Sequence, residues 1–166
     1  MVKSCHAGQE EKERSQKTVD PTYDRTYQKL PKEEFQRILE ATPDAMVIIN
    51  KEGIIIFTNT QAEKIFNYKK DELLGQPVEI LIPEPYRSQH PKHREDYFSS
   101  PHVRPMGTGM ELYGMRKNGE HFPVEISLSP FDMDQDKMAL ATVRDITDRK
   151  RFERTLQEKN IELENA

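Results

Sequence analysis

The sequence contains one cysteine and no tryptophan. Its single cysteine, Cys5, lies near the N-terminus, so no disulfide can form within the chain and a reducing, cytoplasmic setting is expected. A cofactor held through a thiol of the folded core is excluded for the same reason. No run of about 18 apolar residues occurs, and the N-terminus lacks the apolar segment of a signal peptide. We therefore expect a soluble chain that does not itself enter a membrane.

Excess positive charge is also absent. The 166 residues carry 25 basic and 29 acidic side chains, a net charge of −4, so nucleic acid is not expected as a partner. Apolar residues make up 34% and charged residues 33%. Such a polar chain predicts one core of roughly 100–110 residues with solvated ends. We assign residues 1–30 to a tail or loose helix, 31–148 to the folded domain, and 149–166 to a C-terminal helix.

The apolar pattern predicts a helix over 33–42, ending before Pro43, and a hairpin of strands 45–50 and 54–58 around Gly53. Asn59 is suited to cap the next helix. Short helical turns follow, and Pro91 indicates that a further helix begins near His90. Strands are expected at 108–116, 120–129 and 137–147. Consecutive hairpins of this kind predict an α+β fold, in which short helices cover one face of a five-stranded antiparallel sheet.

The C-terminal segment is highly charged but carries a narrow apolar stripe. Phe152, Leu156 and Leu163 fall on heptad core positions, and Lys159 occupies the fourth. This pattern favours the start of a parallel coiled coil, with a homodimer formed through the flanking helices; a solvated helix is the alternative. Thr147 is the expected N-cap of this helix.

Candidate catalytic patterns are incomplete. His90, His93 and His102 resemble a metal cluster, but Pro91 intervenes and no thiol or clear carboxylate completes the set. The two glycines at 107 and 109 precede a strand rather than a helix, unlike a phosphate-binding loop. No nucleophile elbow occurs. We therefore expect no enzyme activity from this chain; any catalysis would belong to a downstream domain.

Several short motifs occur together in a characteristic order. They are Pro43-Asp44-Ala45, Gly53, Asn59, Glu72-Leu73-Leu74-Gly75, Lys117-Asn118-Gly119 with Phe122-Pro123, and Asp145-Ile146-Thr147-Asp148-Arg149. With these motifs, the sequence over about 35–149 resembles the PAS family of sensor domains. This resemblance implies the PAS fold and a role in sensing ligands, redox state or light, ahead of an output domain such as a histidine kinase or cyclase.

The segment from Leu81 to His90 is similar to that of FixL-type oxygen-sensor kinases. The resemblance implies that His90 is the axial iron ligand of haem b, and that Arg104 lies where a propionate-contacting histidine is found. The strand pattern supplies an apolar wall, because Ile126 and Leu128 share one face and Met110 and Leu112 lie two residues apart on the neighbouring strand.

The sequence departs from this group at two positions. Met110 replaces the arginine that stabilises bound oxygen, and since methionine cannot donate a hydrogen bond, Met110 would be an apolar lining or a sixth ligand. Asp96 replaces an arginine that contacts a propionate. A fatty acid, a non-covalent flavin, ordinary core packing and a ligand-free dimerisation module stay open. The photoactive flavin subclass is excluded, because no cysteine lies between Asn59 and Pro101.

Overall fold

The computed structural model describes residues 32–107 and 110–166; the predicted tail at 1–30 lies outside these residues. The larger compact unit of the chain is Gln36–Ala166. The helices and strands of the described residues follow the predicted order, with an additional short strand. The elements are α2 (Lys32–Ala41), β1 (Ala45–Asn50), β2 (Ile55–Thr58), α3 (Thr60–Phe66), α4 (Lys70–Leu73), the 3-10 turn η1 (Val78–Leu81), α5 (Glu84–Arg87), α6 (His90–Ser99), β3 (Arg104–Pro105), β4 (Leu112–Met115), β5 (His121–Met133), β6 (Asp136–Asp145) and α7 (Thr147–Glu164).

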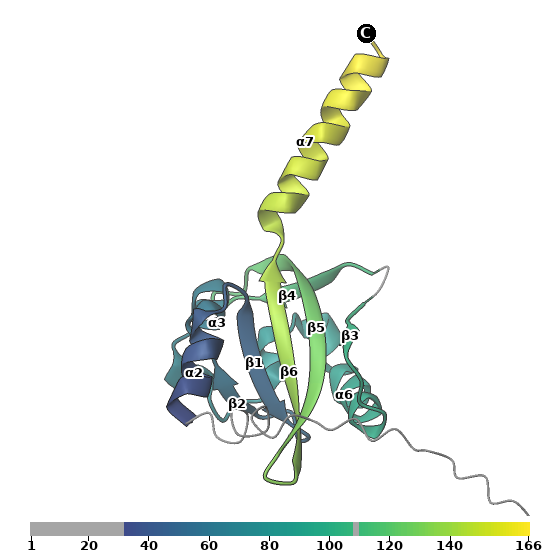
Figure 1. Cartoon of the computed structure of the whole chain (residues 1–166). Coiled ribbons are helices and arrows are strands. Elements are labelled where there is room, and N and C mark those ends of the chain that lie inside the picture. The colour runs from purple at the N-terminus through teal and green to yellow at the C-terminus, as the bar shows by residue number, and fades with distance from the viewer. Residues whose placement is uncertain (1–31, 108–109) are drawn as a thin grey trace, which may run out of the picture. The chain divides into compact units, whose positions relative to one another are not determined.

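The strands form one antiparallel sheet in the order β2-β1-β6-β5-β3, and β4 also pairs with β5 (Figure 1). The predicted α+β architecture is confirmed. The strand predicted at 108–116 corresponds to the shorter β4, and the additional strand β3 precedes it in the sequence. These two pieces lie one after the other along the same edge of β5.

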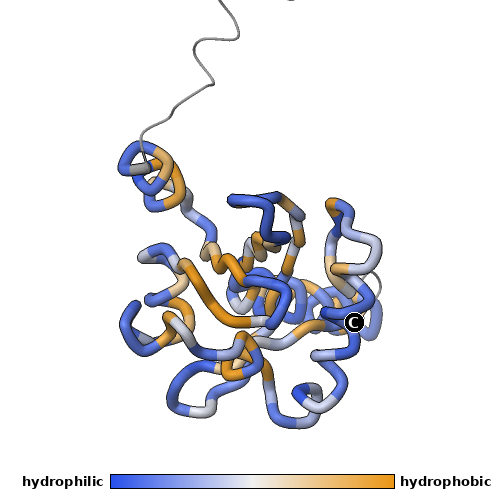
Figure 2. The backbone as a smooth tube through the Cα atoms, turned by 90° about the horizontal axis from the view of Figure 1, so that it is seen from below, coloured by the Kyte–Doolittle hydropathy of each residue, from blue (hydrophilic) through white to orange (hydrophobic). Residues whose placement is uncertain are grey.

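The core lies between the inner face of the sheet and the short helices. Val47, Phe122 and Val124 point inward at alternate positions of their strands and are almost completely buried. The ring of Phe66 from α3 meets Phe122 edge to face, with centroids 5.5 Å apart. Hydropathy along the backbone agrees, with hydrophobic segments toward the middle and hydrophilic segments in the loops (Figure 2).

Helix α7 continues from the end of β6 (Figure 1). Thr147 is its first residue rather than its N-cap, which corrects the prediction. The carboxylate of Asp145 accepts hydrogen bonds from the backbone N–H and the hydroxyl of Thr147, at 2.9 and 2.5 Å. Beyond its first turn α7 is exposed, including the apolar side chains of Phe152 and Leu156. No helix among the described residues is long and apolar enough to cross a membrane.

The turn between β1 and β2 depends on Gly53, which is buried and has a φ of +84°. The guanidinium of Arg94 occupies the space that a β-carbon on Gly53 would need. Gly53→Ala is therefore expected to lower the free energy of unfolding by about 2 kcal/mol, through backbone strain and displacement of Arg94.

The matched control for this change is Gly75→Ala. Gly75 has a φ of +78°, but nothing lies within 4 Å of its missing β-carbon. Strain alone predicts a loss of about 1 kcal/mol. Urea unfolding of the two variants measures the difference, and equal losses would show that Arg94 moves aside without cost.

Candidate ligand-binding site

Helix α6 carries the histidine that the sequence singles out. It begins at His90, as predicted, and Pro91 lies in its first turn, where the missing N–H breaks no helical hydrogen bond. Tyr97 is buried in the core. Since residues seven apart lie on nearly the same stripe of a helix, His90 shares the core-facing side of α6 with Tyr97. The site is therefore built on the inner surface of α6.

The imidazole of His90 contacts a carboxylate from another element. Its Nδ1 lies 2.8 Å from Oε1 of Glu79 in η1, and Arg94, one turn along α6, donates to the same oxygen. The side chains of His90, Glu79 and Arg94 are only 18, 15 and 13% exposed. Burial raises the pKa of Glu79, but the hydrogen bond from His90 and the charge of Arg94 more than offset this, so the pKa lies below its ordinary value.

An apolar wall faces α6 from the strands. Leu112 of β4 and Ile126 and Leu128 of β5 are partly buried and pack against the core, in the places that their spacing predicts. Strand alternation explains the arrangement, because residues two apart on β5 project to the same side. The wall thus offers apolar contacts to whatever lies between α6 and the sheet.

Met110 does not join this wall, contrary to the expectation. Its side chain is 71% exposed, and it precedes β4 instead of lying in a strand. Gly107 has a φ of +63°, and its carbonyl accepts a hydrogen bond from the Met110 N–H at 2.8 Å. This turn interrupts the alternation that would place Met110 beside Leu112. Met110 is therefore exposed instead of packed in the core, although it borders the same groove as Leu112 and Ile126.

Arg104 lies at the edge of the same region, in β3 opposite Leu128. Its guanidinium is 5.2 Å from the ring centroid of Tyr97. Within the part of the chain that the structure describes, Arg104 Nε and Tyr97 Oη are buried without a hydrogen-bond partner. Burial raises the pKa of Tyr97, and the charge of Arg104 opposes this. Each of these two buried groups can donate to an acceptor such as water or a ligand carboxylate.

Sequence reasoning missed three members of this arrangement: Glu79, Arg94 and Tyr97. A signal existed for two of them, because Arg94 and Tyr97 lie four and seven residues after His90 and so share its side of the helix. Glu79 had no comparable signal. It reaches His90 from a 3-10 turn eleven residues upstream, through tertiary packing.

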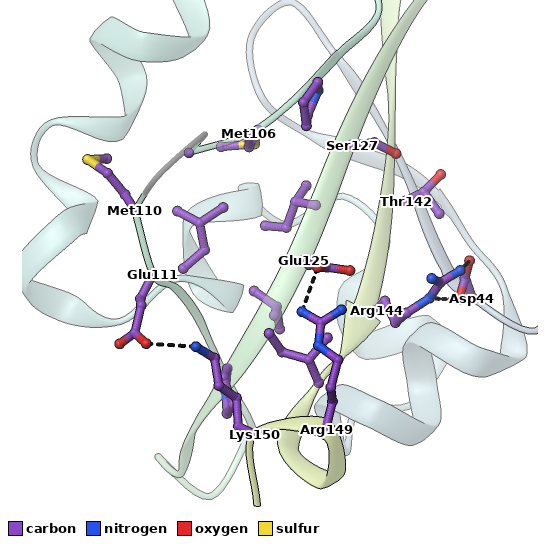
Figure 3. A pocket seen from close by; sticks show the side chains of 17 residues that line it. Asp44, Met106, Met110, Glu111, Glu125, Ser127, Thr142, Arg144, Arg149 and Lys150 are labelled. Atoms are coloured by element: carbon purple, nitrogen blue, oxygen red, sulfur yellow. Dashed lines mark hydrogen bonds and ion pairs between the residues drawn. The ribbon is translucent and has the colours of Figure 1, made fainter. Parts of the chain in front are cut away.

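A groove of about 480 Å³ lies over β5, β6 and the start of α7 (Figure 3). Its lining brings together three of the predicted site residues, Met110, Leu112 and Ile126. Its rim carries three ion pairs, and Met106 and Met110 lie at its far end. The pairs are Asp44 with Arg144, Glu125 with Arg149, and Glu111 with Lys150. Because every one of these cations is already paired, the groove has no evident anion-binding function.

A metal centre built from side chains finds no support in residues 32–107 and 110–166. No group of three or more histidine, cysteine, aspartate or glutamate residues there could hold an ion. His102 contacts the backbone carbonyl of Ser100 at 2.8 Å. The three histidines of the helix region therefore do not form a shared site.

Comparison with known proteins agrees with this architecture. The family model of the PAS domain matches residues 43–148. The sensor protein FixL of Bradyrhizobium diazoefficiens is 37% identical over 131 residues, covering 78% of this chain and 26% of that protein. The oxygen sensor protein DosP of Escherichia coli is 31% identical over 111 residues, covering 67% of this chain and 14% of that protein. The chain thus spans about a quarter or less of these relatives.

A solved structure supports the fold independently of sequence. The PAS domain of the HTR-like protein from Haloarcula marismortui superposes with a TM-score of 0.59 at 22% identity, covering 69% of this chain and 90% of that one. The family match spans well over half of the sequence and includes every strand of the sheet. The chain belongs to the PAS domain family.

Proposed function

We propose that this chain is the sensor module of a signalling protein, which binds haem b between α6 and the sheet and passes the signal through α7. The receiver would be a downstream output domain such as a histidine kinase or cyclase. Two relatives that carry sensor names, FixL and DosP, support this proposal. The observation that carries it is a half-buried histidine on the core-facing side of α6.

The residues present suit haem in chemical type. His90 would supply an imidazole ligand to the iron, and Leu112, Ile126 and Leu128 would supply apolar contacts to the porphyrin. Arg104, with Tyr97 beside it, would hold a propionate through donors that lack a partner among the described residues. When bound, haem supplies an iron centre that binds small gases or changes redox state. Met110 remains a proposed lining residue, because it borders the same groove as Leu112 and Ile126.

Insertion of a porphyrin requires α6 to move away from the strands, because the intervening side chains already pack together. Such a displacement would shift the strands of the sheet and, through them, the start of α7. The first turn of α7 contacts β5 through the pair of Arg149 with Glu125, and it contacts the residue before β4 through the pair of Lys150 with Glu111. A two-state bias of about 1–3 kcal/mol is typical of such coupling between sites.

An absorption spectrum tests the proposal. The protein reconstituted with haem is expected to show a Soret band, which His90→Ala loses because the axial ligand is gone. His93→Ala is the matched control, since His93 is exposed on the same helix and should leave the band unchanged. A wild-type protein that stays colourless after reconstitution refutes haem binding.

The second candidate is a ligand-free module that dimerises through its flanking helices. Exposed apolar side chains on both helices favour it: Phe35 and Ile38 on α2, and Phe152, Leu156 and Leu163 on α7. Sedimentation of the colourless protein separates the two proposals. A dimer that Leu156→Glu converts to monomer, with no bound ligand on mass spectrometry, favours this alternative.

A further inference from the structure

The contact between His90 and Glu79 has a direct consequence for the imidazole. An ionised carboxylate only accepts hydrogen bonds, so the nitrogen that lies 2.8 Å from Glu79 Oε1 must carry the proton. That nitrogen is Nδ1. A neutral His90 in this contact therefore has its proton on Nδ1 and a free lone pair on Nε2.

Arg94 keeps the carboxylate in its accepting role. Its guanidinium donates to the same Glu79 oxygen and packs over Gly53 in the β1–β2 turn. An arginine is always charged, so it holds its partner as an acceptor. Because His90 and Arg94 lie one helical turn apart, one carboxylate oxygen receives both donors without distortion of α6. The hairpin, η1 and α6 thus fix the cluster from three sides.

We propose that Glu79, held by Arg94, is a positioning residue that locks His90 in the Nδ1-protonated tautomer and presents Nε2 as its only basic nitrogen. The fixed tautomer does not depend on a cofactor. Its effect on iron rests on the proposed function: a carboxylate that accepts from Nδ1 orients an imidazole whose Nε2 binds a metal, and it makes that imidazole a more basic ligand. A more basic ligand favours ferric over ferrous iron.

The first test needs no cofactor. Nitrogen-15 NMR of the cofactor-free protein at about pH 9, where histidine is ordinarily neutral, reports which ring nitrogen carries the proton. Wild type is expected to show the Nδ1-protonated form of His90. Glu79→Ala should shift His90 to the Nε2-protonated form that free imidazole side chains prefer. A wild-type His90 protonated on Nε2, or an unchanged spectrum in Glu79→Ala, overturns the proposal.

Two further variants separate positioning from folding. Glu79→Gln keeps an acceptor oxygen that Arg94 can orient, so the Nδ1-protonated form should be retained even if Glu79→Ala unfolds. Glu95→Ala removes an exposed acid from α6, the helix of His90, and changes the net charge by the same amount as Glu79→Gln. It should leave the tautomer of His90 unchanged. Loss of the Nδ1-protonated form of His90 in both Glu79→Gln and Glu95→Ala would contradict the positioning role of Glu79.

A redox titration supplies the second readout if haem binds. Loss of the carboxylate charge in Glu79→Gln should raise the haem midpoint potential by about 59 mV, which corresponds to a tenfold change in ferric-to-ferrous preference. An unchanged potential refutes the effect on iron. If wild-type His90 is protonated on Nδ1 but the protein takes up no haem, haem binding is refuted. The proposal that Glu79 fixes the tautomer of His90 is then still supported.

Discussion

Replacement of Asn59 by alanine is expected to lower the free energy of unfolding by about 4 kcal/mol, because this fully buried amide uses its complete hydrogen-bonding capacity. Its oxygen accepts from the N–H groups of Met46 and Ala62 at 2.9 and 3.1 Å. Its amide nitrogen donates to the carbonyls of Leu39 and Asp44, both at 3.0 Å. Alanine leaves these buried groups unsatisfied and removes the cap of α3.

Urea unfolding at pH 7 measures the loss, and hydrogen exchange at the Met46 and Ala62 amides locates it. Asn118→Ala is the matched control, because Asn118 is exposed and its side chain accepts a hydrogen bond from the Glu120 N–H alone among the described residues. Its expected cost is below about 1 kcal/mol. Equal small losses in the two variants would mean that water replaces the Asn59 side chain.

The cap at Asn59 also shows what local sequence can predict. An asparagine before an apolar helical stripe is a short-range signal, and the structure places its oxygen on the Ala62 N–H as expected. The helix start at His90 is equally local, since proline is favoured in the first turn. The alternation in β5 likewise predicts the inward face that holds Ile126 and Leu128.

The edge strand was predicted less well, for a physical reason. Period-2 alternation assumes an unbroken strand, whereas the turn at Gly107 separates β3 from β4. Met110 therefore loses its register with Leu112 and points to solvent. The Glu79 contact could not be inferred at all, because it depends on how η1 packs against α6 and not on any spacing along one element.

The junction between β6 and α7 gives the second large prediction, because Asp145 connects three parts of the fold. Its carboxylate accepts from the guanidinium of Arg116 at 2.9 Å and from Thr147 at the start of α7. The Arg116 guanidinium also lies 3.9 Å from the ring centroid of Phe122 and donates to the carbonyl of Ile65. Asp145→Asn removes the less exposed of the two carboxylates that pair with this mostly buried cation, because Glu120, 3.3 Å from Arg116 Nε, lies largely in solvent. A loss of about 3 kcal/mol is expected at pH 7.

The pH dependence of this loss follows from the pKa of Asp145. Burial raises that pKa, but hydrogen bonds from Thr147 and Arg116 and the Arg116 charge more than offset this, so it lies below its ordinary value. A lowered pKa in the folded state means that the stabilisation is complete above the unfolded-state pKa of about 3.9. It is lost as the pH falls from there through the folded-state value.

Wild type and Asp145→Asn should therefore differ most at neutral pH and converge as the pH falls below about 4. Urea unfolding between pH 3 and pH 7 measures the gap. Glu125→Gln is the control, because Glu125 pairs with Arg149 at the exposed surface, where ion pairs contribute little. A gap between wild type and Asp145→Asn that stays constant with pH would show that the Asp145 charge is not what holds Arg116 and the start of α7 together.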